Sequence, residues 1–145
     1  YSTERRDSPE TPEACRIIAQ WAEQGLDPVI VTGRPTYANA DTREWLDAHG
    51  LGGVRILHVD KYAKLFNPSD DPLITPFPAL RDMDVRFAVD DAPNAIRMIV
   101  ETRLCPFAVF TRPWNRHYAP PETDLPHYRV THWHEIARIV EGIFG

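Results

Sequence analysis

The sequence predicts an α/β fold built on a parallel β-sheet, and three observations support that prediction. Segments with the helical spacing of apolar residues alternate with short apolar runs typical of buried strands. Two of those runs end abruptly in polar residues, at Thr32 and at Asp90. The composition, with 43% hydrophobic and 26% charged residues in a chain of 145, is ordinary for a globular protein, so we expect one domain over residues 1–145.

The expected elements follow from local signals. Helices begin at a capping residue or at a proline in the first turn and end at glycine, whereas strands are apolar runs bounded by turn residues. In chain order, the expected elements are helix 11–24, strand 29–32, helix 41–49, strand 54–59, strand 86–90, helix 93–100, strand 107–110, strand 128–132 and helix 133–143.

The first two helices carry both a start and a stop signal. Thr11 is followed by a proline at the first helical position, and apolar residues then recur at helical spacing until Gly25. Asp41 or Thr42 opens the second helix, which Gly50 closes. Each of these helices therefore leads directly into a predicted strand.

The second half of the chain contains more proline. Residues 66–84 hold four of the 14 prolines and few periodic apolar residues, so we expect an irregular surface excursion with a short helical turn near Ala79. Pro93 then starts the third helix, and a proline-rich loop over 113–126 precedes the last strand and helix.

Charge limits the class of partner. The net charge of −5 argues against nonspecific binding of nucleic acid through a basic surface. A local basic pocket would still hold a small anionic substrate. The residues that would form such a pocket are Arg34, Lys61, Lys64, Arg112 and Arg116.

Cysteine usage and hydropathy indicate the compartment. Cys15 and Cys105 have no CxxC spacing and no companions at metal-ligand spacing, so we expect reduced thiols. No apolar run approaches the roughly 18 residues of a membrane span, and the first residues are too polar for a signal peptide. We therefore expect a cytoplasmic protein without membrane contact.

Polar side chains follow the two strands that end at Thr32 and Asp90. Gly33 and Arg34 come after the first, and Asp91 after the second. Because parallel strands deliver their carboxyl ends to the same edge of a sheet, we expect these residues to converge on one pocket. A hydroxyl, backbone amides and paired carboxylates suit a phosphate with a divalent cation.

Six segments in this order and spacing resemble the haloacid dehalogenase superfamily of phosphohydrolases, especially its 5'-nucleotidase-like and polynucleotide 3'-phosphatase-like members. The segments cover most of the chain, and each alone is a weak signal. They are 32–35 (TGRP), 42–50 (TREWLDAHG), 60–64 (DKYAK), 87–94 (FAVDDAPN), 110–117 (FTRPWNRH) and 128–133 (YRVTHW).

The resemblance implies a three-layer Rossmann-like fold, with helices on both faces of a parallel sheet. It implies a Mg²⁺-dependent phosphomonoester hydrolase that acts through an aspartyl-phosphate, with Asp90 and Asp91 as metal ligands. Thr32, Gly33 and Arg34 would bind the phosphate. The catalytic residues implied within this chain are Thr32, Asp90 and a lysine, for which Lys64 is preferred over Lys61.

Residues 113–118 resemble a segment of the nucleotidase-like members. This resemblance points to a nucleoside monophosphate as the substrate. We expect Asn115, Arg116 and His117 to recognise the leaving group, or else to pair locally in a surface loop. Trp114 would stack on a base or pin the loop to the core. The substrate is therefore a phosphorylated small molecule or a nucleic-acid end, and we prefer a nucleotide-type phosphomonoester.

The resemblance also implies a first strand ending in Asp-x-Asp that supplies the nucleophile, but residues 1–11 contain no apolar strand. Asp82 and Asp84 form the only Asp-x-Asp, and proline-rich sequence precedes them, so we interpret them as noncatalytic. The missing strand would be central, between the strands ending at Thr32 and Asp90. Three explanations are open. An upstream segment or domain supplies the strand, or another segment or a partner chain supplies it. In the third, no such strand exists and the two flanking strands pair directly in a flavodoxin-like sheet.

A second class of function stays open. The chain would then be a catalytically silent α/β domain that keeps the phosphate-binding edge as a ligand or partner surface. In that case Thr32 is an ordinary strand-end hydroxyl, and Asp91 caps the helix that starts near Pro93. Asp90 is harder to explain this way, because a carboxylate at the end of an apolar strand needs a cation or several donors.

Overall fold

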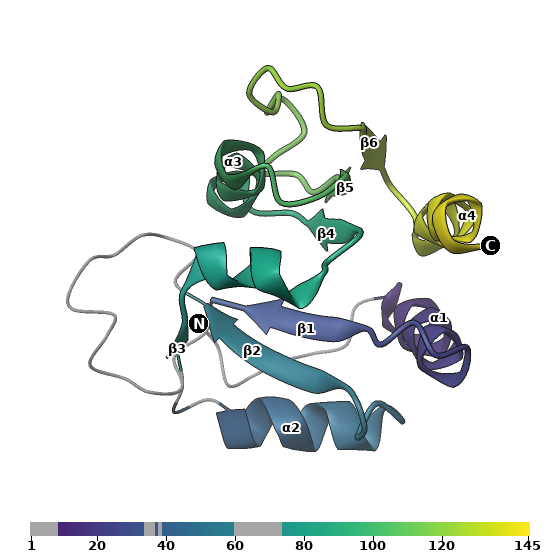
Figure 1. The fold of residues 1–145 in the computed structure, drawn as a ribbon. Helices are drawn as coiled ribbons and strands as arrows, with labels where there is room; N and C mark the ends of the chain where they lie inside the picture. The colour runs from purple at the N-terminus through teal and green to yellow at the C-terminus, as the bar shows by residue number, and fades with distance from the viewer. Residues whose placement is uncertain (1–8, 34–36, 38, 60–73) are drawn as a thin grey trace. The chain divides into compact units, whose positions relative to one another are not determined.

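The computed structural model describes residues 9–33, 37, 39–59 and 74–145, and these residues form a mixed α/β structure with two small parallel sheets (Figure 1). The described residues before Pro76 form one unit, here unit 1, and those from Pro76 to Gly145 form unit 2. In the described ranges, no helix combines the length and the apolar character needed to cross a bilayer.

Unit 1 is a three-stranded sheet with two helices. The strand order is β1-β2-β3 with all neighbours parallel, and α2 lies along one face of the sheet (Figure 1). The register places Thr32 beside His58. The elements are α1 (Thr11–Glu23), β1 (Val29–Thr32), α2 (Asn39–Ala48), β2 (Arg55–Val59) and β3 (Ile74–Thr75).

Both predicted glycine stops in unit 1 are confirmed. Gly25 and Gly50 have φ of 80° and 78°, in the left-handed region that glycine enters without steric cost. After the second stop, the N–H of Leu51 bonds back to the carbonyl of Leu46 at 2.8 Å. The chain therefore leaves each helix by a turn that reverses it toward the next strand.

Unit 2 repeats the parallel arrangement, in the order β4-β5-β6. Its central strand β5 is buried along its whole length, which is why its sequence is a continuous apolar run. The elements are the 3₁₀ helix η3 (Phe77–Met83), β4 (Ala88–Asp90), α3 (Pro93–Thr102), β5 (Phe107–Phe110), β6 (His127–Val130) and α4 (Trp133–Phe144).

The core of unit 2 consists of apolar residues from the strands and helices. Phe107, Ala108, Ile96 and Ile136 are each 0% exposed. Each large aliphatic or aromatic side chain buried in this way contributes about 1.5–3 kcal/mol relative to exposure. Burial in this core fixes the position of β5, and with it the start of the loop that follows the strand.

The predicted helices and strands are present, with small shifts of their ends. The helical turn expected near Ala79 is η3, but the expected irregular excursion over 66–84 also contains β3, which was missed because two residues carry no periodic signal. The last strand ends at Val130 instead of residue 132, because His132 is the N-cap of α4. Residues 60–73 of that region lie outside the described residues.

Within the described residues, the sheet pairings involve β1 with β2 and β4 with β5, so one edge of β1 and one edge of β4 carry no described partner strand. Direct pairing of β1 with β4, one of the three explanations for the missing strand, is not seen among these pairings. The single sheet and the single domain over 1–145 stay predictions.

Candidate functional site

The first group of candidate residues forms the turn between β4 and α3. Asp90 is the last residue of β4, and its Oδ1 accepts hydrogen bonds from the backbone N–H groups of Asp91 at 2.8 Å and Ala92 at 2.9 Å. Pro93, which has no N–H to satisfy, is the first residue of α3. The turn thus fixes the Asp90 carboxylate at the carboxyl end of the strand.

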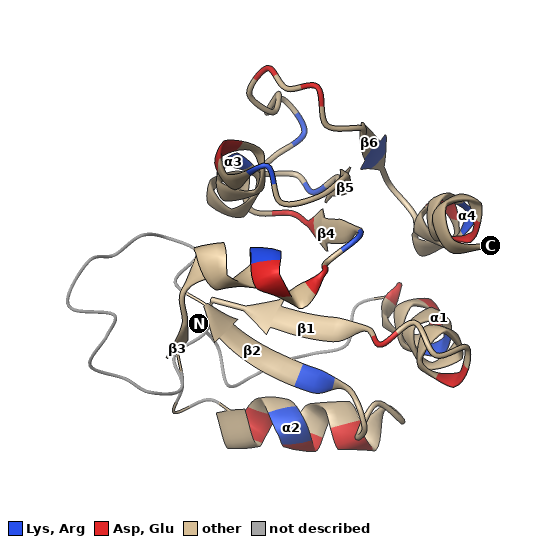
Figure 2. Cartoon of the chain, in the orientation of Figure 1, with Lys and Arg blue, Asp and Glu red and all other residues tan. Residues whose placement is uncertain are grey.

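Asp91 faces a cation from the loop that follows β5. Its Oδ2 lies 3.4 Å from Nε of Arg112, and the guanidinium of Arg112 stacks 4.5 Å above the ring centroid of Phe110. Both charged side chains are about a third exposed, at 30% and 38%, so the pair itself adds about 0–1 kcal/mol to stability. Its main effect is to hold a positive and a negative group together. Figure 2 shows the acidic segment that follows β4 in red.

Asn115 lies behind these charges and is 0% exposed. Its Nδ2 donates to the carbonyl oxygens of Asp91 at 2.8 Å and Phe110 at 2.9 Å. Its Oδ1 accepts from the backbone N–H of Arg112 at 2.8 Å and from Nη1 of Arg129 at 3.2 Å. The amide therefore uses both N–H bonds and both acceptor positions inside the protein, which favours a positioning role.

Further bonds hold the segment 111–118, here the 111–118 loop, in place. Arg129 on β6 donates from Nη1 to the carbonyl of Asn115 at 3.2 Å and from Nη2 to the carbonyl of Tyr118. The hydroxyl of Tyr118 donates to the carbonyl of Pro93 at 3.4 Å. The loop is thereby joined to β6 on one side and to the start of α3 on the other.

Thr111 opens this loop. Its backbone N–H donates to Val130 at 2.8 Å, but its Oγ1 is buried and has no hydrogen-bond partner in the described part of the chain. A buried hydroxyl without a partner is uncommon in folded proteins. The sequence analysis missed Thr111, although its place directly after a fully apolar strand was the available signal.

The other candidate edge lies in unit 1. Thr32 ends β1 with only 9% exposure, and its register partner His58 is 5% exposed. Nε2 of His58 lies 3.1 Å from Oδ1 of Asn39, the first residue of α2. His58 was also missed by the sequence analysis, and the signal was a titratable side chain inside the apolar run of β2.

The predicted site residues thus fall into three groups. Thr32 and Gly33 belong to unit 1, whereas Asp90, Asp91 and residues 115–117 belong to unit 2. The convergence of the two groups on one pocket stays a prediction. Arg34, Lys61 and Lys64 lie outside the described residues.

Metal binding can be judged from the chemistry of the donors. In the described ranges, no group of three or more His, Cys, Asp or Glu side chains is clustered to hold a metal ion. Mg²⁺ is commonly bound by one or two carboxylates and completes its shell with water and substrate phosphate. Asp90 and Asp91, which are neighbours in the sequence, have the donor chemistry for that smaller requirement, and Asp91 is at the same time paired with Arg112.

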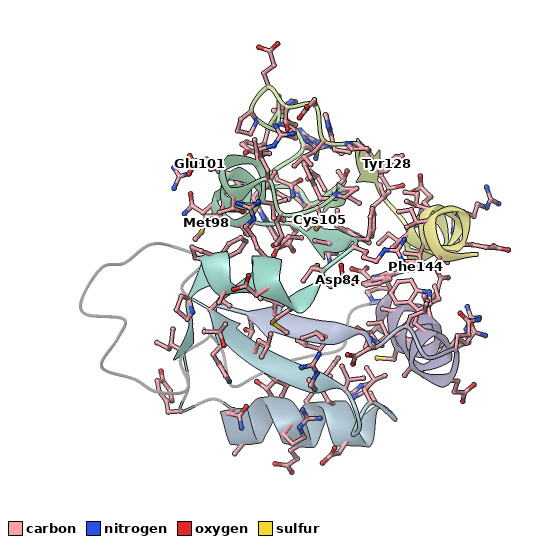
Figure 3. All side chains as sticks on the ribbon, in the orientation of Figure 1. Asp84, Met98, Glu101, Cys105, Tyr128 and Phe144 are labelled. Carbon is pink, nitrogen blue, oxygen red and sulfur yellow. The ribbon has the colours of Figure 1, made fainter. Side chains whose placement is uncertain are left out.

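The described cysteines do not offer a nucleophile. Cys105, labelled in Figure 3, precedes β5 and is 4% exposed, and Cys15 on α1 is 8% exposed. Burial raises the pKa of the Cys105 thiol to about 12, so at neutral pH it is protonated and unreactive.

Asp82 and Asp84 are poorly placed to supply the nucleophile. They lie in η3 and at its C-cap, and not at the end of a strand.

Comparisons with protein-family models, with curated proteins and with solved structures gave no match to this chain. The resemblance to haloacid dehalogenases therefore rests on the motifs alone. It stays a hypothesis, to be judged by the chemistry of the residues just described.

Proposed function

We propose that the chain belongs to a Mg²⁺-dependent phosphomonoester hydrolase of the haloacid dehalogenase type. The observation that supports this most is the turn after β4. There a carboxylate is held by two backbone amides, and a second carboxylate pairs with Arg112 at the carboxyl end of a parallel strand. The proposed substrate is a nucleotide-type phosphomonoester, with a nucleic-acid end as the other possibility within this class.

The proposal includes the finer expectation of a three-layer Rossmann-like sheet. The unpaired edges of β1 and β4 among the described strands support it, since an open edge accepts a further strand through its backbone groups. The reaction needs a nucleophilic Asp, which the resemblance places on a strand before residue 12. That strand would have an edge of this kind to pair with.

In this proposal each residue has a defined task. Asp90 and Asp91 provide oxygen ligands for Mg²⁺, which when bound offsets the repulsion between a carboxylate nucleophile and the phosphate. Thr32 donates its O–H and Gly33 its N–H to phosphoryl oxygens. Lys64, or else Lys61, adds positive charge. The nucleophile forms an aspartyl-phosphate as the alcohol leaves, and water then hydrolyses it.

The test is release of inorganic phosphate by the purified protein, together with the segment that supplies the Asp-x-Asp strand, from p-nitrophenyl phosphate, mononucleotides and a 3'-phosphorylated oligonucleotide, with Mg²⁺ or with EDTA. Asp90→Asn should lower Mg²⁺-dependent turnover more than about a hundredfold. The Asn side chain can still accept the two backbone hydrogen bonds, so the turn should persist. The circular dichroism spectrum and the unfolding midpoint should therefore change little.

Asp84→Asn is a matched control, because Asp84 is an exposed carboxylate in the same unit with φ of 55°, a conformation that Asn tolerates. Its turnover should equal that of the wild type. Full activity of Asp90→Asn would contradict the metal role.

The alternative, a catalytically silent domain with a phosphate-binding edge, is favoured by one observation: Asp82-x-Asp84, the only Asp-x-Asp of the chain, does not end a strand. A well-folded protein that includes the proposed Asp-x-Asp strand and still turns over none of the substrates would support that alternative over hydrolysis.

A further inference from the structure

Trp114 stands out because the residue next to it is fully buried. Asn115 is 0% exposed, whereas 68% of Trp114 is exposed. The sequence allowed two roles for this indole, a stacking surface or a pin that holds the loop to the core. In the structure, the side chain of Asn115 holds the loop through four hydrogen bonds, and the indole of Trp114 is exposed to solvent.

The exposed ring is displayed from a rigid base. The N–H of Asn115 bonds to the carbonyl of Arg112 at 3.1 Å, and the N–H of Tyr118 bonds to the carbonyl of Asn115 at 2.9 Å. These bonds add to those from Arg129 and to the hydrogen bond between Tyr118 and Pro93. A ring carried on an ordered backbone loses less conformational entropy when a flat ligand stacks on it than a ring on a mobile loop.

The two exposed residues that follow Asn115 favour an anionic ligand. Arg116 and His117 follow in the same loop, both exposed, and neither forms an ion pair with another described residue. By contrast, Arg112 is already held by Asp91. Trp114, Arg116 and His117 are thus all exposed within four consecutive residues, and an indole, a guanidinium and an imidazole are suited to a molecule that combines an aromatic ring with a phosphate.

We propose that the 111–118 loop is a nucleotide-binding subsite, in which the base of a nucleoside monophosphate stacks on Trp114 while Arg116 and His117 attract its phosphate. A mononucleotide is favoured over a nucleic-acid strand for two reasons. The loop displays a single large exposed aromatic ring, whereas strand-binding proteins use several together with a basic groove. The net charge of −5 also opposes a polyanion. The inference deepens the proposed hydrolase function, although base binding itself needs no catalysis.

The test is a binding measurement by calorimetry in EDTA, where turnover cannot occur. The probes are AMP and ribose 5-phosphate, which differ only in the base. The wild type should bind AMP at least about tenfold more tightly, and Trp114→Ala should abolish that difference. Trp114→Phe, which keeps a ring, should retain most of it. Tyr37→Ala is the matched control, because Tyr37 is an exposed aromatic residue of unit 1, and it should bind AMP like the wild type.

Several outcomes would overturn the proposal. These are equal binding of AMP and ribose 5-phosphate, an unchanged AMP preference in Trp114→Ala, or no saturable AMP binding at millimolar concentration. Tighter, Trp114-dependent binding of a 3'-phosphorylated oligonucleotide would replace the mononucleotide with a nucleic-acid end. The proposed function fails separately: Trp114-dependent AMP binding without turnover leaves this subsite standing, whereas turnover without a base preference removes only the subsite.

Discussion

The two sheets end in polar edges of different kinds. In unit 1, the edge consists of the neutral hydroxyl of Thr32 and the imidazole of His58, both nearly buried, with Asn39 as the partner of that imidazole. In unit 2, the edge carries two carboxylates and Arg112. One edge therefore suits hydrogen bonding to an anion, and the other suits a cation.

The edges also differ in how they are held. The unit 2 edge is joined across all three of its strands, because Asn115 bonds to Asp91 after β4 and to Phe110 at the end of β5, and accepts a hydrogen bond from Arg129 of β6. In unit 1, the contact between His58 and Asn39 joins β2 to the start of α2. In unit 2, a buried amide therefore holds together the backbone of the segments that carry the charged side chains.

The largest effect is expected from breaking the network of unit 2. Asn115→Ala removes four hydrogen bonds and leaves the buried carbonyl of Phe110 without this partner, so the free energy of unfolding should fall by about 3 kcal/mol. Urea unfolding followed by circular dichroism measures it. Asn39→Ala, an exposed residue of unit 1, should cost less than about 1 kcal/mol. Equal costs would show that the two edges are held alike.

A smaller effect should decide whether the unit 1 edge takes part in catalysis. Thr32→Val keeps the shape of the side chain but removes the hydroxyl, so kcat should fall by roughly ten- to a hundredfold. Thr32→Ser restores the hydroxyl and should recover most of the activity. Steady-state phosphate release with Mg²⁺ gives the values. If Thr32→Val were fully active, the phosphate-binding role of this edge would be lost.

The smallest effect concerns the start of α4. Oε1 of Glu135 accepts from the N–H of Thr131 at 2.9 Å, from its hydroxyl at 3.0 Å and from the N–H of His132 at 3.0 Å. The bonds from Thr131 are the main cause that lowers the pKa of Glu135 below its ordinary value of 4.5. Since the folded state favours the charged form, this contribution is present above about pH 4.5 and is lost as the pH falls through the lowered pKa.

Glu135→Gln should therefore lower the stability slightly at pH 7 and weaken its dependence on pH in the acid range. Urea midpoints at neutral pH and at successively lower pH values measure this. Parallel curves for the variant and the wild type would mean that the Glu135 carboxylate contributes nothing. Asp124→Asn is the variant with which Glu135→Gln is compared. Asp124 is also an exposed carboxylate, and its pKa is lowered chiefly by its hydrogen bond to Arg103.

Signals within a few residues predicted most of the local structure. Gly25 and Gly50 end their helices because only a residue without a Cβ enters φ near +80° without strain. Pro93 begins α3 for a similarly local reason, since its fixed φ suits the first helical position. The candidate carboxylates were found in the same way, because a strand that ends in Asp90 and Asp91 is visible in the sequence itself.

The tertiary structure decided what depends on residues far apart in the chain. Asn115 reads as a polar loop residue, yet it is fully buried because Asp91, 24 positions earlier, and Arg129, 14 positions later, meet it there. Its neighbour Trp114, by contrast, is 68% exposed. Backbone preferences and apolar periodicity act over a few residues, whereas hydrogen-bond partners and burial are set only when the strands have packed side by side.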